Sequence, residues 1–235
     1  MWVLALDTST RDGSAAIARN GRLVAASRGD GHRTHGERLP GDLLTLAREA
    51  GVALPAIDLF AVSIGPGSFT GLRVGIATVQ ALALVRGRPV VPVSTLDVLA
   101  LVRASRQDDA ADRILAWMDG GRREVFASLY AGDGTTRLGE PRVGSAASVL
   151  EAWQSSLADR RVAVIGDGVR STRSILESRL GSAAALDASP PPLAPAMARM
   201  AYEQRAHGIA PHAVHPLYIR RPDAVLARER TTGGG

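Results

Sequence analysis

The stretch Ile64-Gly65-Pro66-Gly67-Ser68-Phe69-Thr70-Gly71-Leu72-Arg73-Val74-Gly75 decides the fold, because it joins a predicted strand to a long apolar helix. Three glycines and a proline lie within residues 65–71, which excludes the interior of a helix or a strand. We call this segment the glycine turn; it comprises Gly65, Pro66, Gly67, Ser68, Phe69, Thr70 and Gly71. Its backbone N–H groups would face the start of the next helix, which suits either a bound anion or very close packing of another backbone. No Gly-Lys-Ser or Gly-Lys-Thr follows, so it is not a Walker phosphate loop, and the spacing of Gly71 and Gly75 favours packing.

The residues around the glycine turn predict an α/β lobe. Residues 58–64 are a continuous apolar run, which is typical of a buried parallel strand. Asn20-Gly21, between two strand-like segments, predicts a hairpin. The predicted strands are 2–7, 13–19, 23–28, 58–64 and 89–93, and the predicted helices are 36–50, 70–85 and 94–104.

The second half of the chain begins again in the same form. Residues 114–119 repeat the pattern of residues 2–7, an apolar strand that ends in aspartate. Strands at 124–130, 138–143 and 161–165 and helices at 146–156 and 169–180 complete the copy. A duplicated β-β-β-α-β-α unit is typical of actin-like, sugar-kinase and Hsp70-type ATPase folds, an analogy of fold alone. We therefore predict a first lobe at 1–105, a smaller second lobe at 106–190, a helix at 194–208 that packs back on the first lobe, and an extended basic tail at 209–235.

Composition excludes several kinds of chemistry. The 235 residues include no cysteine and no lysine, so thiol catalysis, thiolate metal sites and Schiff bases are all excluded. The net charge of +5 would suit an RNA-associated protein, yet the arginines are scattered, which favours a solvated basic surface. No run is long enough to cross a bilayer, and Met1 leads directly into an apolar strand, so we expect a cytoplasmic protein without membrane contact.

Few residues are arranged as reactive groups. Asp7 and Asp119 each end an apolar strand, where an aspartate could handle a metal ion and phosphate or cap a turn. His32 and His35, with Glu37 nearby, have no evident third metal ligand. No serine lies in a Gly-x-Ser-x-Gly elbow. The sequence therefore predicts no catalytic residue and no metal site.

The helix at 70–85 is apolar nearly all round. Such a helix is either deeply buried or shared with a partner. The leucines of the preceding predicted helix could extend the same contact. The pattern alone leaves burial and a partner both open; if a partner shares the helix, the interface residues would be Leu39, Leu43, Leu46, Arg73, Val74, Ala77, Ala81 and Leu84.

The chain resembles the TsaB (YeaZ) family over nearly its whole length. The residues that carry the resemblance are 4–10, 65–75, 93–96, Asp119 with Glu124-Val125, Gly166-Asp167-Gly168, and 216–220. The segment with Ser68-Phe69-Thr70 is the most specific. The resemblance implies an actin-like (ribonuclease H-like, ASKHA) fold of duplicated β-β-β-α-β-α lobes, and a pairing surface formed by the first two helices of the N-terminal lobe.

The resemblance also implies a non-catalytic scaffold that activates a TsaD-like catalytic subunit, with a TsaE-like ATPase as third partner, in tRNA threonylcarbamoyladenosine modification next to the anticodon. It implies no cofactor, a homodimer when the chain is alone, and tRNA contact only within the complex. TsaD-type chains have a His-x-x-x-His pair, and this sequence has none. The aspartates Asp7 and Asp119 would then be a vestigial phosphate site. The competing hypothesis is an actin-like ATPase or small-molecule kinase that uses Asp7 and Asp119.

Overall fold

The computed structural model describes residues 1–106, 110–217 and 219, and these residues form two five-stranded mixed sheets. The first sheet has the order β3-β2-β1-β4-β5, and the second has the order β10-β9-β6-β7-β8. In both sheets three antiparallel strands continue into two parallel ones. The two sheets therefore share one topology, which confirms the predicted duplication. The strands are β1 (Trp2–Asp7), β2 (Ser14–Arg19), β3 (Arg22–Arg28), β4 (Leu59–Gly65), β5 (Val90–Ser94), β6 (Arg113–Gly121), β7 (Glu124–Ala131), β8 (Arg142–Ser145), β9 (Val162–Ile165) and β10 (Ala185–Asp187).

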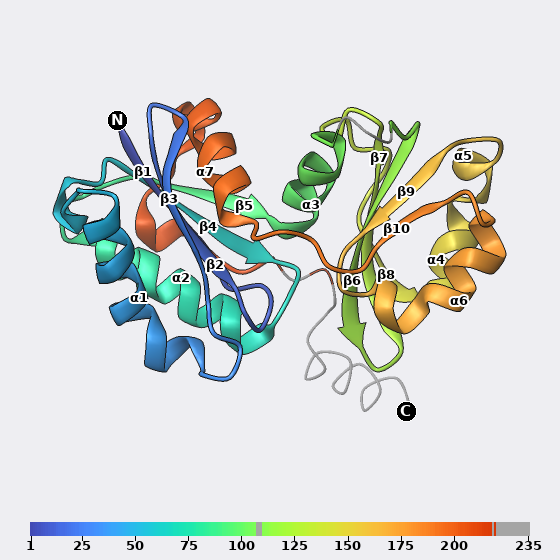
Figure 1. Ribbon diagram of the computed structural model, residues 1–235, viewed down its shortest axis with the longest axis horizontal. Coiled ribbons are helices and arrows are strands. Elements are labelled where there is room, and N and C mark those ends of the chain that lie inside the picture. Colours follow the sequence, from blue (N-terminus) through green and yellow to red (C-terminus); the bar gives the residue numbers. More distant parts are fainter. Residues whose placement is uncertain (107–109, 218, 220–235) are drawn as a thin grey trace, which may run out of the picture.

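Helices cover both faces of the first sheet. Figure 1 shows α1 and α2 on one face, α7 on the other, and α3 between the two lobes. The α-helices are α1 (His35–Glu49), α2 (Phe69–Leu84), α3 (Thr95–Ala104), α4 (Ala146–Ala152), α5 (Gln154–Leu157), α6 (Val169–Leu180) and α7 (Ala194–Glu203). Short 3₁₀ turns are η1 (Leu54–Ala56), η2 (Arg205–His207) and η3 (Pro211–Ala213). After the second lobe, α7 returns to contact β1 and β2.

The predicted elements of the second lobe need three corrections. The third strand is β8 at Arg142–Ser145 and not 138–143, because Gly139 has a φ of 103° and Pro141 has no N–H to donate. The predicted helix at 146–156 divides at the buried Trp153 into α4 and α5. Strand β10, three residues long, was not predicted. Of the predicted tail at 209–235, residues 218 and 220–235 lie outside the described residues.

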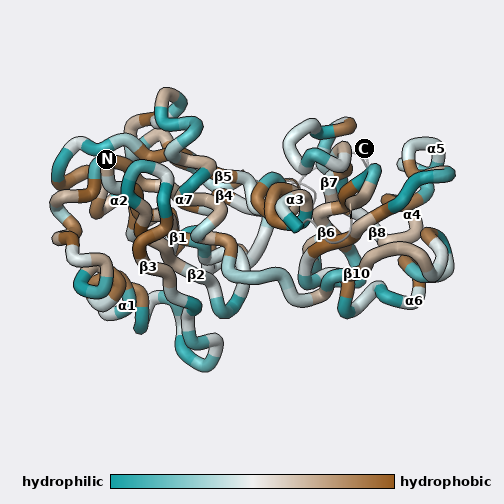
Figure 2. Tube along the Cα trace, turned by 45° about the horizontal axis from the view of Figure 1, so that its top comes forward, coloured by the Kyte–Doolittle hydropathy of each residue, from teal (hydrophilic) through white to brown (hydrophobic). Residues whose placement is uncertain are grey.

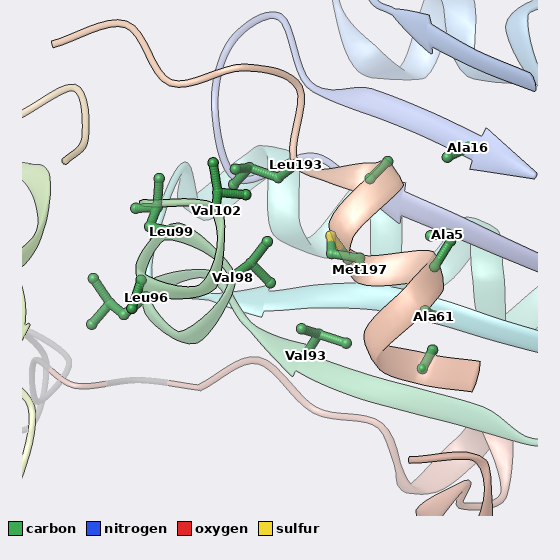
Figure 3. Close-up of a cluster of buried hydrophobic side chains, with 14 of the residues drawn as sticks. Ala5, Ala16, Ala61, Val93, Leu96, Val98, Leu99, Val102, Leu193 and Met197 are labelled. Carbon is green, nitrogen blue, oxygen red and sulfur yellow. The ribbon is translucent and has the colours of Figure 1, made fainter. Parts of the chain in front are cut away.

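The two lobes share one hydrophobic cluster. Leu96 and Leu99 of α3 pack in it with Ala5 of the first sheet and with Met118 of the second. Figure 3 shows α3 and α7 side chains converging above the first sheet, and Figure 2 shows hydrophobic colouring along β6 and around α3. Tyr130 of β7 donates a hydrogen bond of 2.5 Å to Asp97 of α3. The connection between the lobes is thus a packed core and not a flexible linker alone.

Within the described residues, no helix has the length and apolar character that crossing a bilayer requires.

Candidate functional site

Helix α1 begins at a complete capping box. The Thr34 hydroxyl accepts from the backbone N–H of Glu37 at 3.4 Å, and the Glu37 carboxylate accepts from the backbone N–H of Thr34 at 2.8 Å. Hydrogen bonds from the Thr34 hydroxyl and backbone hold the pKa of Glu37 below its usual value. This reciprocal pairing fixes where the helix starts and therefore which side chains face the sheet.

The apolar face of α1 is turned inward. Leu39, Leu43 and Leu46 are 2%, 2% and 1% exposed and belong to the cluster between α1, α2 and the first sheet. The sequence-based assignment of these three leucines to a partner interface is therefore wrong, because they cover the protein's own sheet. Leu44, which the leucine pattern groups on the same side of the helix, is instead 56% exposed.

Helix α2 turns one face to its own core and another to solvent. Arg73, Ala77, Ala81 and Leu84 are exposed, and their spacing of three or four residues places them on one side of the helix. Phe69 continues this side by one turn at the N-terminal end. We call these five residues the α2 face. Val74, also expected at the interface, is only half-buried and packs beside the core cluster.

The α2 face combines apolar ends with a small-residue centre. Phe69 is 58% exposed and Leu84 is 66% exposed, and Val85, directly after the helix, is 78% exposed. The Arg73 guanidinium lies 3.7 Å from the Phe69 ring centroid. Alanines at 77 and 81 leave room for another backbone to come near, whereas the larger side chains at either end would contact it. This arrangement suits docking of a helix or strand from a second protein.

The glycine turn packs against the segment that follows β1. Gly67 has a φ of 156°, and a Cβ there would lie 2.5 Å from the Ser9 carbonyl oxygen. A Cβ on Gly75 would collide with the Thr8 side chain. The backbone N–H of Ser68 donates to the Ser9 carbonyl at 2.7 Å, and the Ser68 hydroxyl accepts from the Gly71 N–H at 3.2 Å. These contacts favour the packing interpretation over anion binding, since N–H groups of the turn are already used.

A cleft of about 200 Å³ lies between the lobes. Asp7 lines it and is 2% exposed, with its Oδ1 accepting from the Ser9 N–H at 2.9 Å. Asp119 is exposed and does not line the cleft; its Oδ1 accepts from the Gly121 N–H at 2.8 Å. The structure therefore does not bring the two predicted aspartates together at the cleft.

The second-lobe carboxylate at the cleft is Asp167, which sequence reasoning named only within a motif. Burial raises the pKa of Asp167, whose Oδ1 accepts from the Asp119 N–H at 3.0 Å. Arg170 donates to the Ala188 carbonyl at 3.1 Å and to the Ser189 hydroxyl at 2.9 Å, which ties the residues after β10 to α6. Ligand pockets usually exceed about 300 Å³, so this cleft is small for a nucleotide.

His35, the first residue of α1, is held by contacts with its own chain. The Nε2 of His35 lies 3.0 Å from the Thr10 carbonyl oxygen, and its Nδ1 lies 2.8 Å from Nη2 of Arg38. Arg38 is 4% exposed; it also donates to the Asp12 carbonyl and, at 2.7 Å, to the Asp42 carboxylate. Burial lowers the pKa of His35. Across the part of the chain that the structure describes, no group of three or more His, Asp or Glu side chains could hold a metal ion.

The fold and these sites together define an actin-like, two-lobed α/β protein with one exposed apolar helix face. Residues 29–188 match the family model described as TsaD: tRNA N6-adenosine threonylcarbamoyltransferase. The solved structure of YeaZ from Pseudomonas aeruginosa is 34% identical, has a TM-score of 0.74, and aligns over 93% of this chain and 99% of that one. The chain belongs to the TsaB (YeaZ) family.

Two other comparisons bear on family and fold. The curated TsaB protein of Haemophilus influenzae, described as a tRNA threonylcarbamoyladenosine biosynthesis protein, is 34% identical over 128 residues, 54% of this chain and 53% of that protein. The matched segment thus spans about half the length of this curated relative. The (R)-2-hydroxyglutaryl-CoA dehydratase component A of Acidaminococcus fermentans is similar in fold alone, with a TM-score of 0.50 at 13% identity over 88% of this chain and 99% of that one.

Proposed function

We propose that the chain is a non-catalytic subunit of the cytoplasmic system that makes tRNA threonylcarbamoyladenosine, and that it docks on a TsaD-like threonylcarbamoyltransferase. Membership of the TsaB family supports the pathway. The α2 face supports the mode of action, because Phe69, Leu84 and the adjacent Val85 expose apolar surface that a partner would bury. The bound subunit would hold the lobes of the catalytic partner in a competent arrangement, with a TsaE-like ATPase as the third component.

The observation that carries this proposal is the exposed side of α2. In the absence of the partner, the same face would pair two copies of this chain about a two-fold axis, since a two-fold interface uses one patch twice. Half of the interface expected from sequence stays in this proposal: Arg73, Ala77, Ala81 and Leu84, with Phe69 added.

The experiment is co-purification of the tagged chain with the TsaD-type protein of its own organism. Ala77→Arg would bury an unpaired charge at the centre of the face and should weaken association by about 3–5 kcal/mol. Ala152→Arg, at an exposed alanine of α4 in the second lobe, is the matched control and should bind like the parent protein. Capture of the partner by Ala77→Arg at the parent level would exclude this face.

The competing enzyme hypothesis has its own test. A kinase or ATPase would need the inter-lobe cleft to hold Mg-nucleotide, with Asp7 as a ligand. Titration calorimetry of the isolated chain with Mg-ATP decides between the two: micromolar binding that Asp7→Ala abolishes would overturn the scaffold proposal. The small cleft and the position of Asp119 outside it lead us to expect no such binding.

A further inference from the structure

Several arginines lie at the end of the first sheet where the strands β1 and β4 begin. Arg19 at the end of β2 pairs with Trp2 at the start of β1, and its guanidinium lies 5.2 Å from the Trp2 ring centroid. The amino group of Met1 donates to the Asn20 side chain at 2.7 Å. Arg22 follows the Asn20-Gly21 turn and pairs with Arg19, so both arginines lie beside the N-terminus, which Figure 1 shows at the outer side of the first lobe.

The end of α7 brings another arginine to the same place. The Tyr202 ring lies against Gly21 of the β2–β3 turn, close enough that a Cβ on Gly21 would be 2.8 Å from it. Arg205 donates to the Tyr202 carbonyl at 2.9 Å, and its guanidinium lies 4.9 Å from the Tyr202 ring centroid. Arg205 and Tyr202 therefore lie at the Asn20-Gly21 turn on the α7 side of the sheet, while Arg22 pairs with Arg19 across the hairpin, on the side of Trp2.

The loop before β5 completes the cluster. Asp58 accepts from the Trp2 N–H at 2.8 Å and lies 3.8 Å from Nη2 of Arg88. Arg86 precedes Arg88 by two residues and is exposed. We call the five arginines Arg19, Arg22, Arg86, Arg88 and Arg205, with the Met1 amino group, the basic edge.

Charge at the basic edge is unbalanced. The carboxylates that these contacts place there are Asp58 and, next to Tyr202, Glu203, so five arginines less two acids leave +3 before the terminal amine is counted. In the described part of the chain, Arg22 and Arg86 have no carboxylate within ion-pairing distance. By contrast, a groove of the second lobe has three arginines and three acids among its lining residues: Arg160, Arg161, Arg179, Asp112, Glu151 and Asp159.

We propose that the basic edge binds the phosphate backbone of RNA; the choice of RNA among polyanions rests on the proposed function. Guanidinium groups bind phosphate in a two-pronged geometry and also stack on unpaired bases. Here two of them already lie over aromatic rings, which offers flat surfaces beside positive charge. The edge also adjoins the α2 face, since Arg86 follows Leu84 and Val85 directly, so RNA on the edge would lie beside a docked partner. The isolated chain should then bind RNA weakly, which differs from the sequence-based expectation of tRNA contact only within the complex.

The test is fluorescence anisotropy of a labelled RNA stem-loop with the full chain, titrated between about 50 and 200 mM salt. The variant Arg19→Gln/Arg22→Gln/Arg205→Gln removes three charges from the basic edge. The variant Arg160→Gln/Arg173→Gln/Arg179→Gln removes three exposed charges from the second lobe and matches the change in net charge. At low salt we expect the edge variant to bind RNA at least about tenfold more weakly than the parent chain. The slope of log affinity against log salt concentration should be shallower by about 2–3, and the control variant should bind with nearly the affinity of the parent chain.

A second variant separates charge from packing. Arg22→Gln/Arg86→Gln leaves both arginine–ring contacts in place, so its folding should be unchanged while its RNA affinity falls. Absence of RNA binding by the parent chain at low salt, or equal losses in the edge and control variants, overturns the inference. Binding of phosphatidylserine vesicles but not RNA at this edge would also overturn it, in favour of a membrane surface. None of these variants alters the α2 face, so co-purification with the partner tests the proposed function separately.

Discussion

Two neighbouring leucines of α1 test the arrangement of the first lobe. Leu43 is 2% exposed within the cluster beneath α1, whereas Leu44, the next residue, is 56% exposed. Leu43→Ala removes a fully packed side chain and should lower the free energy of unfolding by about 2–5 kcal/mol. In a chain of this size each kcal/mol lowers the melting temperature by about 2–4 °C, so a loss of about 3 kcal/mol would lower it by roughly 6–12 °C. Leu44→Ala should change stability by no more than about 0.5 kcal/mol.

Circular dichroism melts of the parent and the two variants provide the measurement, with partner capture as a second readout. Both variants make the same chemical change one residue apart, so helix propensity and composition cancel. If Leu43 were on a partner surface, Leu43→Ala would melt like the parent and capture less partner. That outcome, or an equal drop in melting temperature for both variants, would refute the inward orientation of α1.

Two more predictions concern the packing of the glycine turn and the protonation of His35. Gly75→Ala should lower the free energy of unfolding by about 1–3 kcal/mol, because its Cβ would press on Thr8. Gly41→Ala, where nothing lies within 4 Å of the added Cβ, should raise the free energy of unfolding by about 0.4–1 kcal/mol. Denaturant titrations in which both variants change stability in the same direction would contradict this. Because burial lowers the pKa of His35 in the folded state, unfolding takes up a proton as the pH falls below the ordinary value of 6.5. The stability that neutral His35 contributes is thus fully present above pH 6.5 and is lost as the pH falls below it. His35→Asn should therefore flatten the decline in stability between neutral and mildly acidic pH, and an unchanged decline in denaturant titrations at several pH values would contradict this.

The sequence predicts the helices and strands of this fold better than it predicts which surfaces bind a partner. Alternation, glycines and prolines are local signals, and they were enough for β1, the Asn20-Gly21 hairpin and α6, which the structure has at the predicted residues. Strand β10 was missed because three residues carry too short a pattern, and it exists through pairing with β9. Short elements that depend on a distant neighbour are therefore the ones that sequence pattern does not predict.

Interfaces are harder to predict than strands, because apolar side chains follow the same sequence pattern whether they pack on the protein's own core or on a partner. Helix α1 is amphipathic, and its leucines at 39, 43 and 46 do share one face, but they were assigned to the wrong neighbour. Leu44, which the leucine pattern groups with them, is exposed. Helix α2 is apolar on nearly all sides, so its sequence was compatible with both burial and an interface. The spacing of Leu72, Ile76 and Val79 is that of a core-facing side, and the structure buries all three; the sequence alone leaves open what covers the opposite side. The basic edge was missed for a similar reason, since its arginines come from four separate segments of the chain.

The similarity of the two halves explains the aspartates without a nucleotide. Asp7 is the last residue of β1 and Asp119 lies two residues before the end of β6, and each accepts a hydrogen bond from the backbone N–H two residues later. That bond stabilises the turn that follows the strand, so both copies of the fold need the residue for structural reasons. An aspartate required by a turn would be present whether or not the cleft binds phosphate. The repeated strand-and-aspartate pattern is therefore a signature of the duplicated fold, and an argument for activity has to come from the cleft, where Asp119 is absent and the space is small.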